Sequence, residues 1–153
     1  MTQKETKDRV LFDTCVLLTF FLNEDEADIV EEILKLTIKK EIVGFITASS
    51  IVELTTIFVR KNKEQVLVEL MELLNQNFII LNTTQDTAIL AGGLKAKYQK
   101  FTKGFSHVDA IIAASAIMHN CTVLTYDTEF NRVVEVQKKK PKEFLDNFRY
   151  NKN

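Results

Sequence analysis

The sequence contains few residues that interrupt or cross-link a chain. Its 153 residues include one proline, four glycines, two cysteines and no tryptophan. No apolar run approaches the roughly 18 residues of a membrane-spanning helix, and the polar start MTQKETKDR does not resemble a signal peptide. Cys15 and Cys121 form neither a metal-binding spacing nor a disulfide framework. We therefore expect a reduced, cytoplasmic protein without a membrane segment.

Histidine, glycine-rich loops and net charge are scarce as well. His107 and His119 are the only histidines, which argues against a His-rich zinc site. No glycine-rich loop follows a predicted strand, which excludes a P-loop or dinucleotide-binding motif. The formal net charge of −1 means that nucleic-acid binding would need a local basic patch. The length predicts a single domain over 1–153, with a core at about 9–136 and a C-terminal helix at about 141–150.

Short apolar runs alternate with longer stretches of helical periodicity. We expect strands at 9–12, 42–48, 78–81, 122–125 and 132–137, and helices that begin near 14, 27, 50, 63, 84 and 106. The strands are continuous apolar runs, as burial on both faces of a sheet requires. Strands that alternate with helices require crossovers, which produce parallel pairing. The sequence therefore predicts an α/β fold of three layers, α/β/α, with a parallel sheet of four to five strands.

Four carboxylates fall where these elements meet. Asp13 follows the first strand and Asp127 the fourth, while Glu53 and Asp109 are expected in the first turns of helices beside the sheet. Ligand sites in such folds lie at the carboxyl ends of the strands, so all four should share one edge. Clustered carboxylates repel one another and need a cation, and oxygen-only ligands favour Mg²⁺ or Mn²⁺ over zinc. Such an ion activates water and neutralises charge on a phosphodiester.

Helix capping is the alternative explanation for each acid taken singly. The spacings from Ser50 to Glu53 and from Ser106 to Asp109 fit a capping box. Asp13 could cap the helix that follows it, and the fourth acid could lie in a polar turn. Capping does not require all four acids to share the edge where ligands bind, so their coincidence there favours a metal site.

Polar side chains near the acids are candidates for a supporting role. Thr125 could hydrogen-bond a carboxylate, a metal-bound water or a phosphate, or could simply face inward from its strand. Thr14 and Ser50 are weaker candidates of the same kind. His107 is either a substrate contact or a solvated residue of the first helical turn. The thiol of Cys15 is expected to point into the core.

Basic residues gather in three segments that could hold a polyanion. We expect Lys97, Lys100 and Lys103, which precede the helix of Asp109, to contact substrate. A second segment lies at 60–63 and a third at 138–142. For the third segment, a solvated surface is the preferred interpretation.

With these residues identified, the sequence resembles a known family. The motifs VLFDT, ITASSIVEL, SHVDAIIAASA and LTYDTEF, which contain the four acids, are similar to those of PIN-domain nucleases over roughly 9–136. The likeness is greatest to small VapC-type toxins. It implies a PIN-like three-layer fold and Mg²⁺- or Mn²⁺-dependent RNA cleavage through Asp13, Glu53, Asp109 and Asp127. It also implies a homodimer and an antitoxin that docks near the active site.

The residues argue against two other functions and leave two alternatives open. A receiver-type phosphoacceptor would need paired acids near the first strand and a lysine at the fifth, but Asp13 is followed by Thr14 and Cys15, and 132–136 contains no lysine. A haloacid-type phosphatase would need an aspartate at position 15, which is Cys15. A stand-alone RNA-processing nuclease and a non-catalytic RNA-binding or interaction module with the same fold remain the alternatives to a toxin.

Overall fold

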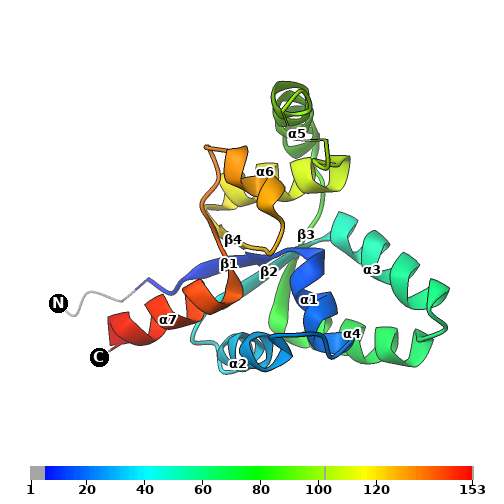
Figure 1. Cartoon of the computed structure of the whole chain (residues 1–153), viewed down its shortest axis with the longest axis vertical. Helices are drawn as coiled ribbons and strands as arrows, with labels where there is room; N and C mark the ends of the chain where they lie inside the picture. The colour runs from blue at the N-terminus through cyan, green and yellow to red at the C-terminus, as the bar shows by residue number, and fades with distance from the viewer. Residues whose placement is uncertain (1–5, 102, 153) are drawn as a thin grey trace.

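A five-stranded sheet forms the centre of the molecule, with every pair of neighbouring strands parallel and the order β3–β2–β1–β4–β5. The computed structural model describes residues 6–101 and 103–152. The strands are β1 (Arg9–Phe12), β2 (Val43–Thr47), β3 (Phe78–Leu81), β4 (Thr122–Leu124) and β5 (Lys138–Lys139). Helices cover both faces of the sheet (Figure 1), which confirms the predicted three-layer α/β/α fold.

The helices divide unequally between the two faces. In the described residues they are α1 (Thr14–Phe21), α2 (Ala27–Ile38), α3 (Ala48–Arg60), α4 (Glu64–Asn77), α5 (Gln85–Tyr98), α6 (His107–His119) and α7 (Pro141–Lys152), with a 3₁₀ turn η1 (Thr128–Arg132). Helices α5 and α6 share one apolar core with the sheet, and the other five share the opposite core (Figure 1). None of these helices is long and apolar enough to cross a membrane.

Strand β1 shows why the apolar runs are continuous. Val10 and Phe12 pack in the core beneath α1 and α2, whereas Leu11 packs in the core beneath α5 and α6. All three side chains are fully buried. Successive side chains of a strand point to opposite faces, so a central parallel strand needs apolar residues at every position.

The fifth strand lies later than the sequence predicts. Residues 132–137, predicted as a strand, form the end of η1 and an irregular segment, and β5 pairs with β4 through Lys138 and Lys139. Val133 and Val136 are buried because they anchor this segment against the core of α6. A short edge strand needs only backbone hydrogen bonds on one side, so its lysines are compatible with pairing.

The start of α3 also differs from the prediction. The hydroxyl of Thr47, at the end of β2, accepts a hydrogen bond from the backbone N–H of Ser50 and caps a helix that begins at Ala48. The capping box predicted for Ser50 and Glu53 is therefore wrong, and Glu53 lies in the second helical turn. The capping box predicted for Ser106 and Asp109 is present at the start of α6.

Candidate active site

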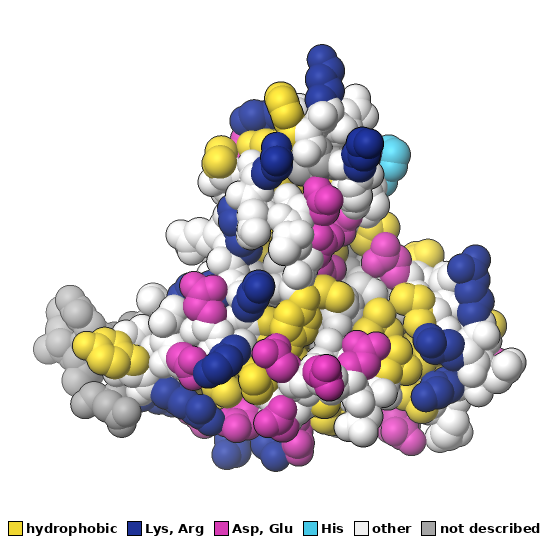
Figure 2. All heavy atoms as spheres, viewed as in Figure 1, with side chains coloured by type: hydrophobic (Ala, Val, Ile, Leu, Met, Phe, Trp, Pro, Cys, Tyr) yellow, Lys and Arg dark blue, Asp and Glu magenta, His cyan; other side chains and the backbone are white. Residues whose placement is uncertain are grey.

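Four carboxylates line one pocket of about 450 Å³ at the carboxyl ends of the strands. They come from four separate segments of the chain: Asp13 after β1, Glu53 in α3, Asp109 in α6 and Asp127 after β4. Figure 2 shows acidic side chains gathered in the hollow between α6 and α3. The acids that the sequence singles out therefore share one surface, although they lie up to 114 residues apart in the chain.

Asp13 is the most enclosed of the four, with only 5% of its surface exposed. Its Oδ1 accepts a hydrogen bond from the backbone N–H of Thr14 at 2.7 Å. Its Oδ2 accepts one from the Thr125 hydroxyl at 2.7 Å and one from the Cys15 thiol at 3.3 Å. Burial, with a smaller contribution from the charge of Asp109, raises the pKa of Asp13 to about 6, although the three hydrogen bonds oppose the shift.

The other three acids each use one carboxylate oxygen within the fold. The acceptor and donor pairs are Glu53 Oε2 with the Thr14 hydroxyl at 2.8 Å, Asp109 Oδ2 with the Ser106 N–H at 2.7 Å, and Asp127 Oδ1 with the Glu129 N–H at 2.8 Å. Within the described part of the chain, the second oxygen of each has no hydrogen-bond donor. Capping and ligand binding are therefore compatible, because a carboxylate offers two oxygens.

The chemistry of this pocket fits a hard divalent cation. The side chains of its described wall that carry charge at neutral pH are carboxylates, which suit Mg²⁺ or Mn²⁺, and its buried Asp13 has a raised pKa that a nearby cation would lower. Across residues 6–101 and 103–152, however, no three His, Cys, Asp or Glu side chains converge closely enough to hold an ion. At least one carboxylate must therefore turn toward the others for an ion to bind.

Two of the three predicted supporting residues contact the acids. Thr125 is buried, donates to Asp13, and accepts a hydrogen bond from the backbone N–H of Asp127 at 2.9 Å. Thr14 donates to Glu53. Ser50 is wholly buried, bonds to Thr47 and does not line the pocket, so the prediction of a contact with the acids is wrong for this residue.

Replacement of Thr125 by valine should weaken the fold in a pH-dependent way. The change nearly conserves volume but removes a donor to a buried carboxylate, a loss of about 2 kcal/mol when the carboxylate is charged. We expect this loss in the free energy of unfolding at pH 7.5, and a smaller one at pH 4.5, where Asp13 carries its proton. Denaturant melts of Thr125→Val would measure both. Thr128→Val at an exposed position is the control, and equal losses at the two pH values would contradict the prediction.

Cys15 contributes to the site in a way that the sequence does not indicate. Its thiol was expected to point into the core, and it also lines the pocket and donates to Asp13. Burial and the charge of Asp13 raise the pKa of the thiol to about 12, so it stays protonated at neutral pH. A protonated thiol is a donor and not a nucleophile. The expected packing against the core is present, because Cys15 is partly buried against the core beneath α1, and the contact with Asp13 adds to it.

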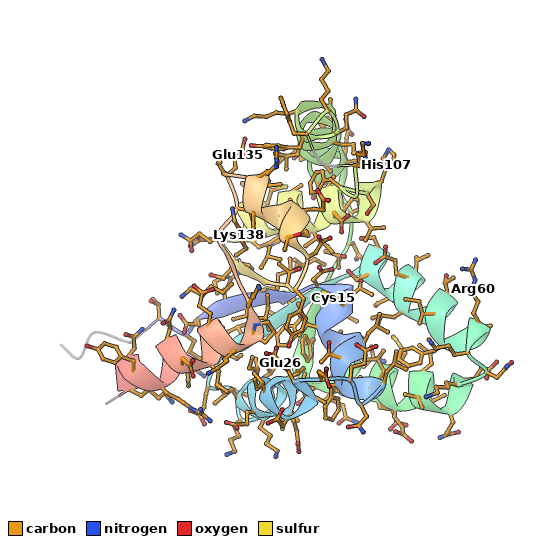
Figure 3. The ribbon with its side chains drawn as sticks, viewed as in Figure 1. Cys15, Glu26, Arg60, His107, Glu135 and Lys138 are labelled. Atoms are coloured by element: carbon orange, nitrogen blue, oxygen red, sulfur yellow. The ribbon has the colours of Figure 1, made fainter. Side chains whose placement is uncertain are left out.

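The predicted substrate contacts lie away from the pocket wall. Lys97 forms an ion pair with Glu135. Lys100, Lys103 and His107 are exposed, and none of them lines the pocket. His107, at the start of α6, lies well apart from Cys15 (Figure 3). Contact of these residues with substrate stays a prediction, because an extended polymer can reach beyond the pocket.

Comparison with known proteins identifies the family. A family model described as the PIN domain matches residues 10–136. The chain belongs to the PIN-domain family. This match confirms the resemblance that the motifs around the four acids indicate, and PIN domains are generally nucleases. A search of curated proteins finds no match.

Solved structures share the PIN fold of this chain at low sequence identity. A chain of VapBC2 from Rickettsia felis, bound to a DNA fragment from its promoter, has a TM-score of 0.69 and 21% identity. The alignment covers 86% of this chain and 97% of that one. DNA-bound VapBC from Salmonella typhimurium has a TM-score of 0.69 and 17% identity, and the alignment covers 88% of this chain and 98% of that one. A toxin–antitoxin complex from Klebsiella pneumoniae has a TM-score of 0.64 and 24% identity, and the alignment covers 86% of this chain and 97% of that one.

Proposed function

We propose that this PIN-domain protein is a Mg²⁺- or Mn²⁺-dependent endoribonuclease and the toxin of a VapBC-type toxin–antitoxin pair. The observation that carries the proposal is the single pocket lined by Asp13, Glu53, Asp109 and Asp127 at the carboxyl ends of the strands. Membership of a family whose members are generally nucleases supports it. The proposed site of action is the cytoplasm.

The proposed mechanism assigns the four carboxylates to the metal. A divalent ion held there would neutralise charge on the scissile phosphodiester and make a bound water more acidic. Thr125 keeps Asp13 in place through its hydroxyl, and Thr14 does the same for Glu53. The donors to Asp13 favour its charged form, which is the form that binds a cation.

Incubation of the purified protein with a panel of RNAs tests the activity. We expect fragments in the presence of Mn²⁺ or Mg²⁺ and none in EDTA. Sequencing of the fragment ends would define the cleavage site and show whether the attack is internal. The absence of cleavage from every RNA in the panel at saturating Mn²⁺ would contradict the proposal.

The proposed partners are an antitoxin and a second copy of the chain. VapBC complexes among the structural relatives support the first of these. Expression of the chain alone should slow growth, and co-expression with a small protein encoded beside it should restore growth and give a complex that co-purifies. A chain that purifies alone and leaves growth unchanged would support a stand-alone RNA-processing nuclease instead. Sedimentation of the purified chain would measure the proposed homodimer.

A non-catalytic binding module is the second candidate function. It is favoured by the capping bonds of Asp13, Asp109 and Asp127, and by the lack of three convergent ligands among the described residues. Under this alternative, Mn²⁺ would not change the melting temperature. Under the nuclease proposal, Mn²⁺ at 100 times its dissociation constant adds about 2.7 kcal/mol to the stability of the fold.

A further inference from the structure

A second, smaller pocket adjoins the acidic one and carries the opposite charge. It has a volume of about 130 Å³ and shares Asp127 with the acidic pocket. Among the described residues, three consecutive lysines, Lys138–Lys140, lie in its wall together with two acids, Asp127 and Glu143. These five side chains have a net charge of +1. The neighbouring acidic pocket has four carboxylates and, in the described part of its wall, no lysine or arginine.

The lysines are held in position by the sheet. Strand β5 is hydrogen-bonded to β4, and the carbonyl oxygen of Lys139 accepts from the backbone N–H of Thr125 at 3.1 Å. Thr125 in turn donates to Asp13 and accepts from the N–H of Asp127. Only these short contacts separate the backbone of Lys139 from two of the four acids. The segment is therefore part of the site's framework, and the interpretation of 138–142 as a solvated surface is wrong for its first two residues, which are half-buried.

Two of these lysines have ammonium groups free to bind a ligand. Lys138 donates to the carbonyl oxygen of Val133 at 3.0 Å, and Lys142 pairs with Asp146. Among the described residues, no hydrogen-bond or ion-pair partner exists for the side chain of Lys139 or Lys140. An unpaired ammonium close to a carboxylate-lined pocket suits an anionic group that spans both pockets, such as a phosphodiester chain.

A third pocket, which borders both the acidic pocket and the β5 pocket, would repel such a chain. This pocket of about 460 Å³ shares Cys15 with the acidic pocket, and its ionisable wall includes Glu24, Asp25 and Glu26 without a lysine or arginine. In Figure 3, Lys138 lies above the start of α7 and Glu26 lies below it. Of these two neighbouring pockets, the one at β5 is the one whose described wall contains lysines, so a polyanion is attracted there and repelled by the other.

We propose that Lys139 and Lys140 bind a backbone phosphate of the RNA on the β5 side of the acidic pocket, next to Asp127. The inference rests on the proposed function and specifies where the substrate leaves the site. The two lysines act as substrate-positioning residues that hold the strand while the carboxylates carry out the chemistry. The contact is to phosphate, so it adds affinity without a preference for particular bases.

The subsite can be tested by the binding of a fluorescently labelled single-stranded RNA. Fluorescence anisotropy would measure its affinity between 50 and 200 mM salt, in EDTA so that no metal is bound and no RNA is cleaved. Each phosphate contact to a single strand contributes about 0.7 to the slope of log affinity against log salt. The variant Lys139→Ala/Lys140→Ala should lose about 0.7 from this slope, because both lysines contact the same phosphate, and should bind on the order of tenfold more weakly. Lys35→Ala/Lys39→Ala is the matched control, because it removes the same charge from the end of α2, near the start of β2, and should keep the parent's slope.

Cleavage in Mn²⁺ separates this proposal from the nuclease itself. The β5 variant should have a raised KM and the parent's kcat, since saturating RNA overcomes a binding defect. If the parent cleaves RNA and the β5 variant has the parent's slope and KM, the subsite is overturned and the nuclease stands. The same conclusion would follow if the β5 variant lost only the binding of an acidic protein partner. A parent that binds RNA through these lysines but never cleaves it would overturn the nuclease and keep the subsite. A parent that does not bind RNA would overturn both.

Discussion

Asp13→Asn and Asp109→Asn should each lower RNA cleavage at least about a hundredfold, because the lost carboxylate contributes several kcal/mol of charge stabilisation through the metal. Asparagine keeps an oxygen that can accept the hydrogen bond from the N–H of Thr14 or of Ser106, so both helix caps survive the substitution. The expected result is a folded protein that has lost its chemistry. Initial rates at saturating Mn²⁺, together with circular dichroism spectra, would measure the two properties separately.

The matched control for these variants is Asp86→Asn. Asp86 also lies in the first turn of a helix, α5, but it is exposed and lies outside the acidic pocket. It should keep the parent's cleavage rate and show what the loss of a first-turn carboxylate alone does. Cleavage by Asp13→Asn and Asp109→Asn at the parent's rate would remove the four-acid site and favour the binding module.

Without metal, the contribution of Asp13 to the free energy of unfolding should fall as the pH rises from about 4 through 6. Its pKa is about 6 in the folded protein and 3.8 in the reference state, so the folded protein holds this proton more tightly than the unfolded chain does. The protonated Asp13 therefore stabilises the folded protein fully below about pH 4, and this stabilisation is lost as the pH rises through 6. A shift of about two units corresponds to at most about 3 kcal/mol.

The difference in free energy of unfolding between the parent and Asp13→Asn isolates this contribution. Both proteins share all other titrating groups, so the difference, measured in EDTA by urea melts at several pH values, reports Asp13. Saturating Mn²⁺ should shrink the loss, because a bound cation favours the charged carboxylate. A difference that is constant from pH 4 to pH 8 would show that Asp13 is not desolvated as its burial implies.

The layered fold could be predicted from the sequence because it depends on local patterns. Continuous apolar runs such as 9–12 and 78–81 need burial on both faces, and only a sheet between two helical layers provides it. The prediction failed at 132–137, where Val133 and Val136 are buried in an irregular segment. Apolar content reports burial, and it indicates a strand only where backbone pairing is also available.

The sequence by itself determined which four acids come together. Each lies at a boundary between predicted elements, and the parallel topology brings such boundaries to one edge of the sheet. The details within the site depended on the tertiary structure. Contacts between residues distant in sequence, such as Thr125 with Asp13 and Thr14 with Glu53, arise only when separate elements pack together. A residue's neighbours along the chain do not reveal them.

The tertiary structure also decided the roles of the thiol and the lysines. Cys15 meets a carboxylate because the first turn of α1 packs at the edge of the pocket. Lys97 is paired with Glu135, whereas Lys139 and Lys140 are unpaired within the described residues. Charge runs look alike in a sequence, and only packing shows which ammonium groups are already neutralised. For this protein, local apolar patterns set the fold and the edge that carries the acids, and long-range contacts decided which side chains at that edge remain free to bind.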